Sequence, residues 1–79
     1  MSKAEIYEKI NIVFRDIFDD ENITVDETTV ANDIEEWDSL QHISLIAAIE
    51  EEFEVKFSMD EMLEMHSVAD MVRFIEIKK

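Results

Sequence analysis

The sequence predicts an all-α fold: a small four-helix bundle of three main helices and a short third helix, with a long loop between the first two. Two observations lead to this prediction. Apolar residues recur at intervals of three and four in separate stretches, as they do on the buried face of a helix. Serine or aspartate precedes each stretch, in the position of a helix N-cap. The 79 residues suffice for one core, so we expect a single domain over residues 1–79.

The charge of the chain limits the classes of function. There are 21 acids against seven bases, which gives a formal net charge of −14. Fourteen of the acids lie between Asp16 and Glu54, a stretch without Lys or Arg. Such a surface repels nucleic acid, anionic membranes and other copies of itself, so we expect a monomer that attracts basic partners. No apolar run is long enough to enter a membrane, and we expect a cytoplasmic protein.

The first helix is predicted over roughly residues 3–18, with Ser2 and Glu5 at capping-box spacing. Its apolar face consists of Ile6, Ile10, Val13, Phe14 and Ile17. Residues 19–37 have no helical period, and we predict a long loop there, a feature that is often functional in a small domain. The residues expected to pin this loop to the core are Ile23, Val25, Val30, Ile34 and Trp37. Its acids lack the Gly and Glu of an EF-hand loop, so we predict no calcium site.

The second helix is predicted from Asp38 to Glu52 or Phe53, with Gln41 completing a capping box. Its apolar residues form two stripes. The core stripe is Leu45, Ile46, Ile49 and Phe53, and the second stripe is Leu40, Ile43 and Ala47. Two interpretations of the second stripe stay open at this point. Either the helix is buried on two sides, or the second stripe is a docking surface rimmed by Glu50 and Glu51.

The remaining residues predict a short helix and a final helix. Ser58 and Glu61 have capping-box spacing and open a helix that runs through Met65. We expect its inward residues to be Met59, Met62 and Leu63. The three methionines Met59, Met62 and Met65 form either ordinary core filling or a soft wall that adapts to guests of different shape. Ser67 opens the last helix, which ends near Lys78 and Lys79 and has an inner face of Val68, Met71, Val72 and Ile75.

Three residues at the start of the second helix are of the types that form a hydrolytic triad. Asp38, Ser39 and His42 lie too close together on one helix end for His to take the Ser proton while Asp orients that His from its far side. There is no Gly-rich nucleophile elbow, and a chain of this size has no room for a water-excluded cleft. We therefore predict no catalytic residues. His42 and His66 are the only imidazoles, and no metal site is predicted with them.

Ser39 instead has the features of an attachment point. The first turn of a helix presents unpaired N–H groups and a partial positive charge, which stabilise a phosphate ester at that position. The chain has no cysteine, so any thioester must be formed on an attached group. A thiol tethered to a small acidic domain can present one cargo to many enzymes at high effective concentration.

The motif Asp38-Ser39-Leu40, followed by an apolar helix that ends in Glu50-Glu51-Glu52-Phe53, resembles the acyl carrier protein family over nearly the whole chain. The resemblance implies 4′-phosphopantetheine on Oγ of Ser39, added from coenzyme A by a phosphopantetheinyl transferase, with Asp38 beside the site. It implies a non-enzymatic carrier that holds acyl intermediates as thioesters for enzymes of fatty acid, polyketide or related biosynthesis.

The resemblance also implies roles for further residues. Those expected to line an acyl chain are Leu45, Ile49, Met59, Met62 and Leu63. Those expected to meet basic patches on partner enzymes are Leu40, Ile43, Ala47, Glu50 and Glu51. Gln41 and Ser44 stand where carriers of fatty acid synthesis usually have acids. The Trp before the Asp, Trp37, resembles the pattern in stand-alone carriers of specialised pathways. Two alternatives remain: an aminoacyl carrier of the D-alanine type, and an acidic helical adaptor that is never modified.

Overall fold

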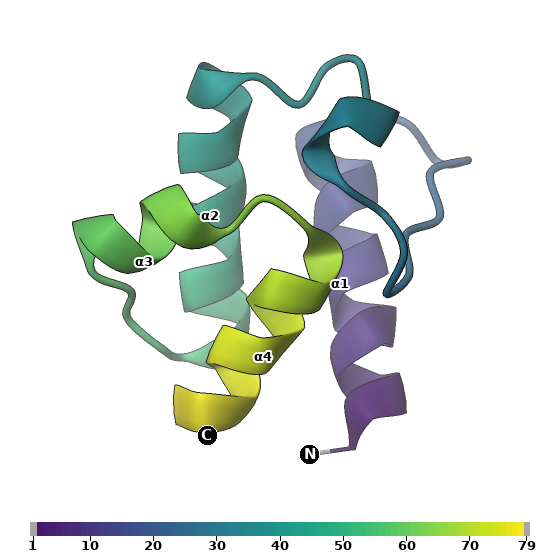
Figure 1. The fold of residues 1–79 in the computed structure, drawn as a ribbon. Coiled ribbons are helices and arrows are strands. Elements are labelled where there is room, and N and C mark those ends of the chain that lie inside the picture. Colours follow the sequence, from purple (N-terminus) through teal and green to yellow (C-terminus); the bar gives the residue numbers. More distant parts are fainter. Residues whose placement is uncertain (1, 79) are drawn as a thin grey trace.

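The computed structural model describes residues 2–78, in which four α-helices enclose one core (Figure 1). The helices are α1 (Lys3–Ile17), α2 (Ser39–Phe53), α3 (Met59–Glu64) and α4 (Val68–Lys78). Within residues 2–78 there is no β-strand, only an isolated antiparallel bridge between Val30 and Ser67. The all-α prediction is confirmed, including the short third helix. No helix in this part of the chain has both the length and the apolar character needed to cross a membrane.

α1 and α2 run in opposite directions, α3 runs across them, and α4 runs in roughly the direction of α2 (Figure 1). α1 and α2 pack against each other, and α3 lies across the face of α2 that is turned away from α1 (Figure 1). The start of α2 lies at the opposite end of the bundle from the first turn of α1 and the last turn of α4 (Figure 1). This arrangement leaves the N-terminal end of α2 clear of both of those ends.

Side-chain caps fix where the helices begin. Ser2 and Glu5 form the predicted capping box of α1, and Ser58 and Glu61 form that of α3. Asp38 caps α2 by accepting the Gln41 N–H at 2.8 Å. The Gln41 side chain makes no return bond, so the predicted capping box at α2 is only half formed, and the cap depends on Asp38 alone. A cap of this kind stabilises a helix by about 1 kcal/mol.

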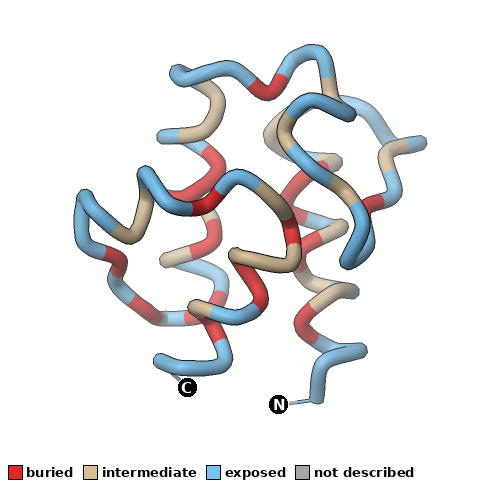
Figure 2. Tube along the Cα trace, in the orientation of Figure 1, coloured by how far each residue is buried: buried red, intermediate tan, exposed pale blue. Residues whose placement is uncertain are grey.

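The core matches the predicted faces of α2 and α4, and that of α1 except for Ile17, which is half-buried. The residues predicted for α4 are buried, and so is the core stripe of α2 (Figure 2). The second stripe of α2, in contrast, is exposed: Leu40 is 74% exposed and Ile43 57%. This excludes the interpretation that α2 is buried on two sides. Burial of one face per helix is the arrangement expected for a bundle of this size.

The loop between α1 and α2 is held by polar contacts as well as by apolar ones. Both polar atoms of the Asn11 side chain pair with the backbone of Val25, at 2.7 and 3.1 Å. The Arg15 Nε donates to the Ile23 carbonyl at 2.7 Å. Of the predicted pins, Val25 and Trp37 are buried, and Ile23 and Ile34 are half-buried. The prediction that the Val30 side chain pins the loop is wrong. That side chain is 40% exposed, and only the Val30 backbone is held, in the bridge to Ser67.

One further feature of the loop differs from the prediction. Ala31–Asp33 form a single 3₁₀ turn, η1, inside the segment predicted to be irregular. The turn brings the Ala31 N–H to the His66 carbonyl at 2.9 Å, next to the connection between α3 and α4. The Asp33 carboxylate caps the turn by accepting the Val30 N–H at 3.0 Å. The loop is therefore fastened to the turn before α4 and contributes to the surface at this end of the molecule.

Candidate functional site

Ser39 is the first residue of α2 and is exposed. The Asp38 side chain before it takes the Gln41 N–H, and the Asp38 carbonyl takes the His42 N–H at 2.8 Å. Among residues 2–78, no backbone acceptor is paired with the N–H groups of Ser39 and Leu40. Two free amides and the positive end of a 15-residue helix therefore lie beside the Ser39 hydroxyl. This arrangement fits a phosphate ester on Oγ, because it supplies donors and a favourable field without a basic side chain.

The neighbouring residues are not arranged as a catalytic triad. The His42 Nδ1 accepts the indole N–H of Trp37 at 2.9 Å, and its Nε2 lies 2.9 Å from the Met62 carbonyl oxygen. Both ring nitrogens are therefore occupied and neither can take the proton of Ser39. The Asp38 carboxylate is directed to its own helix and does not orient the imidazole. Neither His42 nor Asp38 is therefore placed to act as a general base for Ser39.

A groove of about 620 Å³ opens beside Ser39. It lies between the end of the loop, α2 and α3, and most of its wall is apolar. The residues that line it are Ala31, Trp37, Asp38, Ser39, His42, Ile43, Met59, Met62, Leu63, Met65 and His66. All three methionines of the predicted soft wall contribute to it. A flexible thioether wall adapts to guests of different shape at low cost.

The groove includes some of the residues expected to line a cargo site and leaves out others. Met59, Met62 and Leu63 line it, as the resemblance implies. Leu45 and Ile49 do not, because both are completely buried in the core. The prediction that Met59 and Leu63 point inward is corrected: they are 69% and 65% exposed and form the outer side of the groove. A six-residue helix lying on the surface cannot bury all of its apolar side chains.

The expected partner-binding residues lie beside the groove, with one exception. Leu40, Ile43, Ala47 and Glu51 are exposed on one side of α2. Glu50 is half-buried, and its Oε2 accepts the Phe57 N–H at 2.8 Å. Its carboxylate is thus committed to the turn between α2 and α3. Ile43 belongs both to this exposed stripe and to the groove wall.

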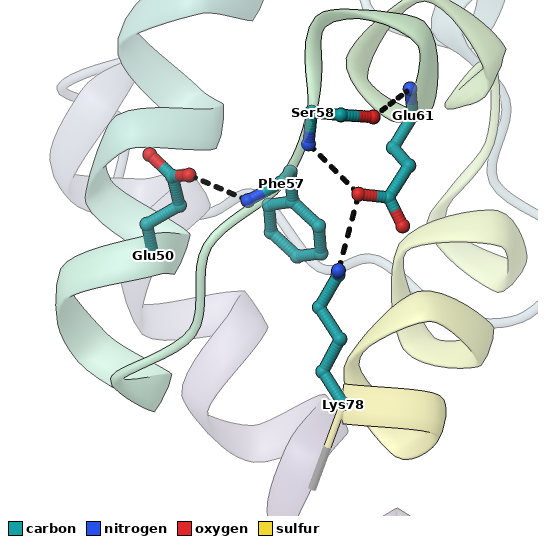
Figure 3. A network of polar contacts seen from close by, with 5 residues as sticks. All are labelled: Glu50, Phe57, Ser58, Glu61 and Lys78. Carbon is teal, nitrogen blue, oxygen red and sulfur yellow. Dashed lines mark hydrogen bonds and ion pairs between the residues drawn. The ribbon is translucent and has the colours of Figure 1, made fainter.

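Glu50 is part of a polar network that fixes the start of α3 (Figure 3). The Glu61 Oε1 accepts the Ser58 N–H at 2.8 Å and also pairs with the Lys78 Nζ at 3.1 Å. The Ser58 backbone N–H and, after it, Lys78 hold the pKa of the Glu61 carboxyl below its usual value. The Lys78 ammonium also lies 5.7 Å from the centre of the Phe57 ring. The start of α3 is therefore tied to the end of α2 and to the last turn of α4.

Several features of the site were not apparent from sequence. Trp37 is buried, as expected of a residue that pins the loop, but its hydrogen bond to His42 was not anticipated. Ala31 of η1 and His66 of the turn before α4 also line the groove, and His66 is far from Ser39 in sequence. Within the described range, no group of three or more His, Cys, Asp or Glu residues could hold a metal ion. Lys79, expected near the C-terminus of α4, lies outside the described residues.

Comparisons with known proteins agree with this site. The family model described as "Phosphopantetheine attachment site" matches residues 13–75. An acyl carrier protein of Thermosynechococcus vestitus is 35% identical over 79 residues, covering 99% of this chain and 96% of that protein. The solution structure of a holo acyl carrier protein from Geobacter metallireducens superimposes with a TM-score of 0.83 at 35% identity, over 91% of this chain and 83% of that one.

Proposed function

The chain belongs to the acyl carrier protein family, whose members bear covalent 4′-phosphopantetheine and are carriers rather than enzymes, and we propose that Ser39 is the residue that bears the group here. The observation that carries this proposal is the exposed hydroxyl at the start of α2, beside the unpaired N–H groups of Ser39 and Leu40. When bound, the arm supplies the thiol that a chain without cysteine lacks. Asp38 holds the helix start in place, so that a transferase meets a rigid target.

The groove beside Ser39 is the proposed shelter for the carried group. It begins at the attachment residue and its wall consists mainly of apolar side chains, which favours an acyl chain over a charged cargo. The methionines would let one groove accept acyl groups of different shape. We infer a carrier of acyl intermediates for fatty acid, polyketide or related biosynthesis.

The second stripe of α2 is the proposed docking surface for partner enzymes and for the phosphopantetheinyl transferase. Leu40 and Ile43 supply exposed apolar contact area next to Ser39, and Glu51 supplies charge at the far end of the stripe. A small apolar contact with an acidic rim suits fast, charge-steered exchange between partners with basic patches. Glu50 is half-buried and its Oε2 accepts the Phe57 N–H, so Glu51 is the more accessible of the two acids.

The proposed function is tested by loading. The purified chain is incubated with coenzyme A and a promiscuous phosphopantetheinyl transferase, and its intact mass is measured. A gain of one phosphopantetheine is expected. An unchanged mass, under conditions that modify an established carrier, would favour an acidic adaptor that binds partners through α2 without modification.

A further inference from the structure

The imidazole of His42 connects two parts of the chain that are distant in sequence. Its Nδ1 accepts the Trp37 indole N–H at 2.9 Å, and its Nε2 is 2.9 Å from the Met62 carbonyl oxygen. An indole N–H can only donate and a carbonyl oxygen can only accept. Both bonds therefore require one form of the ring, the neutral tautomer with its proton on Nε2. We call this arrangement the His42 bridge: the indole of Trp37, the ring of His42 and the carbonyl of Met62.

One end of the His42 bridge is anchored in the core. Trp37 is 8% exposed, and its ring meets that of Phe14 of α1 edge-on, with centroids 5.3 Å apart and an interplanar angle of 81°. The His42 ring stacks on the indole at a centroid distance of 6.0 Å. The indole N–H is half of a buried pair, so removal of its acceptor would leave a buried donor without a partner. The imidazole is therefore held from the core side at a fixed position.

The other end of the bridge contacts the C-terminal half of α3. α3 has six residues, and an isolated helix of that length is not stable in water. Its first turn is fixed by the Ser58–Glu61 capping box and the Lys78 ion pair. Met59 at its start and Leu63 near its end face solvent, the buried Met65 follows the helix, and the Met62 carbonyl pairs with His42 of α2. Met62 itself lines the groove.

On the premise of the proposed function, we infer that His42 is a positioning residue for the carried group. Its bridge fixes α3 as one wall of the groove beside Ser39, because the ring is held by the indole of Trp37 on one side and donates to the Met62 carbonyl on the other.

A control for His42 is the second imidazole of the groove. His66 contributes to the wall from the turn between α3 and α4. Among residues 2–78, the ring of His66 makes no hydrogen bond, so His66→Asn is the matched control for His42→Phe.

The bridge is measured first by NMR, on both the unloaded chain and the holo chain. Long-range ¹H–¹⁵N spectra should show His42 as a fixed tautomer with the proton on Nε2, while the tautomers of His66 interconvert. Hydrogen exchange of the Trp37 indole and of the α3 amides, corrected for the intrinsic rate, should speed up by roughly tenfold in His42→Phe. A His42 spectrum with freely interconverting tautomers would overturn the inference. Because the unloaded chain suffices, this outcome is distinguishable from a failure of loading at Ser39.

The effect on the carried group is measured with an environment-sensitive fluorophore on the arm of the holo chain. Its emission should shift towards the value in water in His42→Phe, because the wall no longer covers it. His66→Asn should leave the emission as in the wild type. If His42→Phe retains the wild-type emission, the positioning role is excluded. Should that variant fail to fold, Trp37→Phe tests the same bond, with a shift in the same direction expected and an unchanged emission overturning the inference.

Discussion

The carboxylate of Glu50 accepts the backbone N–H of Phe57 at 2.8 Å, across the turn that joins α2 to α3. Its neighbour Glu51 is exposed and has no such partner among the described residues. Two adjacent acids that were both expected to rim a docking surface therefore have different tasks. Glu50 holds the chain where it turns back, while Glu51 is exposed to solvent.

This difference predicts that Glu50 contributes to the stability of the fold and that Glu51 does not. Glu50→Ala should lower the free energy of unfolding by about 1–2 kcal/mol, because a half-buried N–H loses its acceptor. Glu51→Ala should change it by less than about 0.5 kcal/mol, as is usual for an exposed side chain. Urea denaturation followed by circular dichroism measures both variants. Equal losses in the two would contradict the assignment of the turn to Glu50.

The cap at the start of α2 predicts different effects for the loss of the Asp38 side-chain acceptor and for the loss of its charge. Asp38→Ala should cost about 1 kcal/mol of stability, because the Gln41 N–H loses the carboxylate that it meets at 2.8 Å. Asp38→Asn should retain most of that stability, since an amide oxygen also caps a helix. Thermal denaturation of the two variants provides the measurement. If Asp38→Asn is loaded much more slowly than the wild type although it folds normally, the charge of Asp38 serves the transferase rather than the helix.

The network at the start of α3 predicts a dependence on pH. The Ser58 N–H and Lys78 lower the pKa of Glu61 in the folded chain relative to the unfolded chain. A lowered folded-state pKa contributes stability above the unfolded-state value, and that stability is lost as the pH falls through the folded-state value. Glu61→Gln keeps the cap but loses the charge. This variant should be less stable than the wild type at neutral pH, and the two should converge in acid; a difference that is constant with pH would contradict the role of the charge.

The surplus of acids predicts a dependence on salt. The formal net charge is −14, and within residues 2–78 the ion pairs are Lys9–Glu52, Arg73–Asp70 and Lys78–Glu61. Repulsion among the remaining carboxylates should weaken as salt screens them, so the melting temperature should rise between low and moderate ionic strength. Differential scanning calorimetry over a series of sodium chloride concentrations provides the measurement. A melting temperature that falls with added salt would show that the few ion pairs outweigh the repulsion.

Local sequence patterns account for most of the fold. The helix starts at Ser2, Asp38 and Ser58 were predictable because an N-cap acts only on the next three residues. The inner face of α4 was predictable because its apolar period is regular and the helix packs on one side. The position of Ser39 in the first turn of α2 was predictable for the same reason.

The parts that sequence did not predict depend on contacts between distant residues. His42 meets a carbonyl 20 residues away, and nothing in its local surroundings indicates that partner. Glu50 resembles an exposed acid until the turn brings the Phe57 N–H back to it. Leu45 and Ile49 are apolar, as residues that line an acyl chain are, but both side chains lie in the core, and other residues line the groove.

The most direct measurement is to locate the attached group. Ser39 and Ser44 are both exposed serines of α2, and only Ser39 lies at its first residue. After loading from coenzyme A, digestion and tandem mass spectrometry should place the phosphopantetheine on Ser39. Ser39→Ala should gain no mass, while Ser44→Ala should be loaded as the wild type is. Loading that survives in Ser39→Ala, or that is lost in Ser44→Ala, would contradict the assignment of the start of α2 as the attachment site.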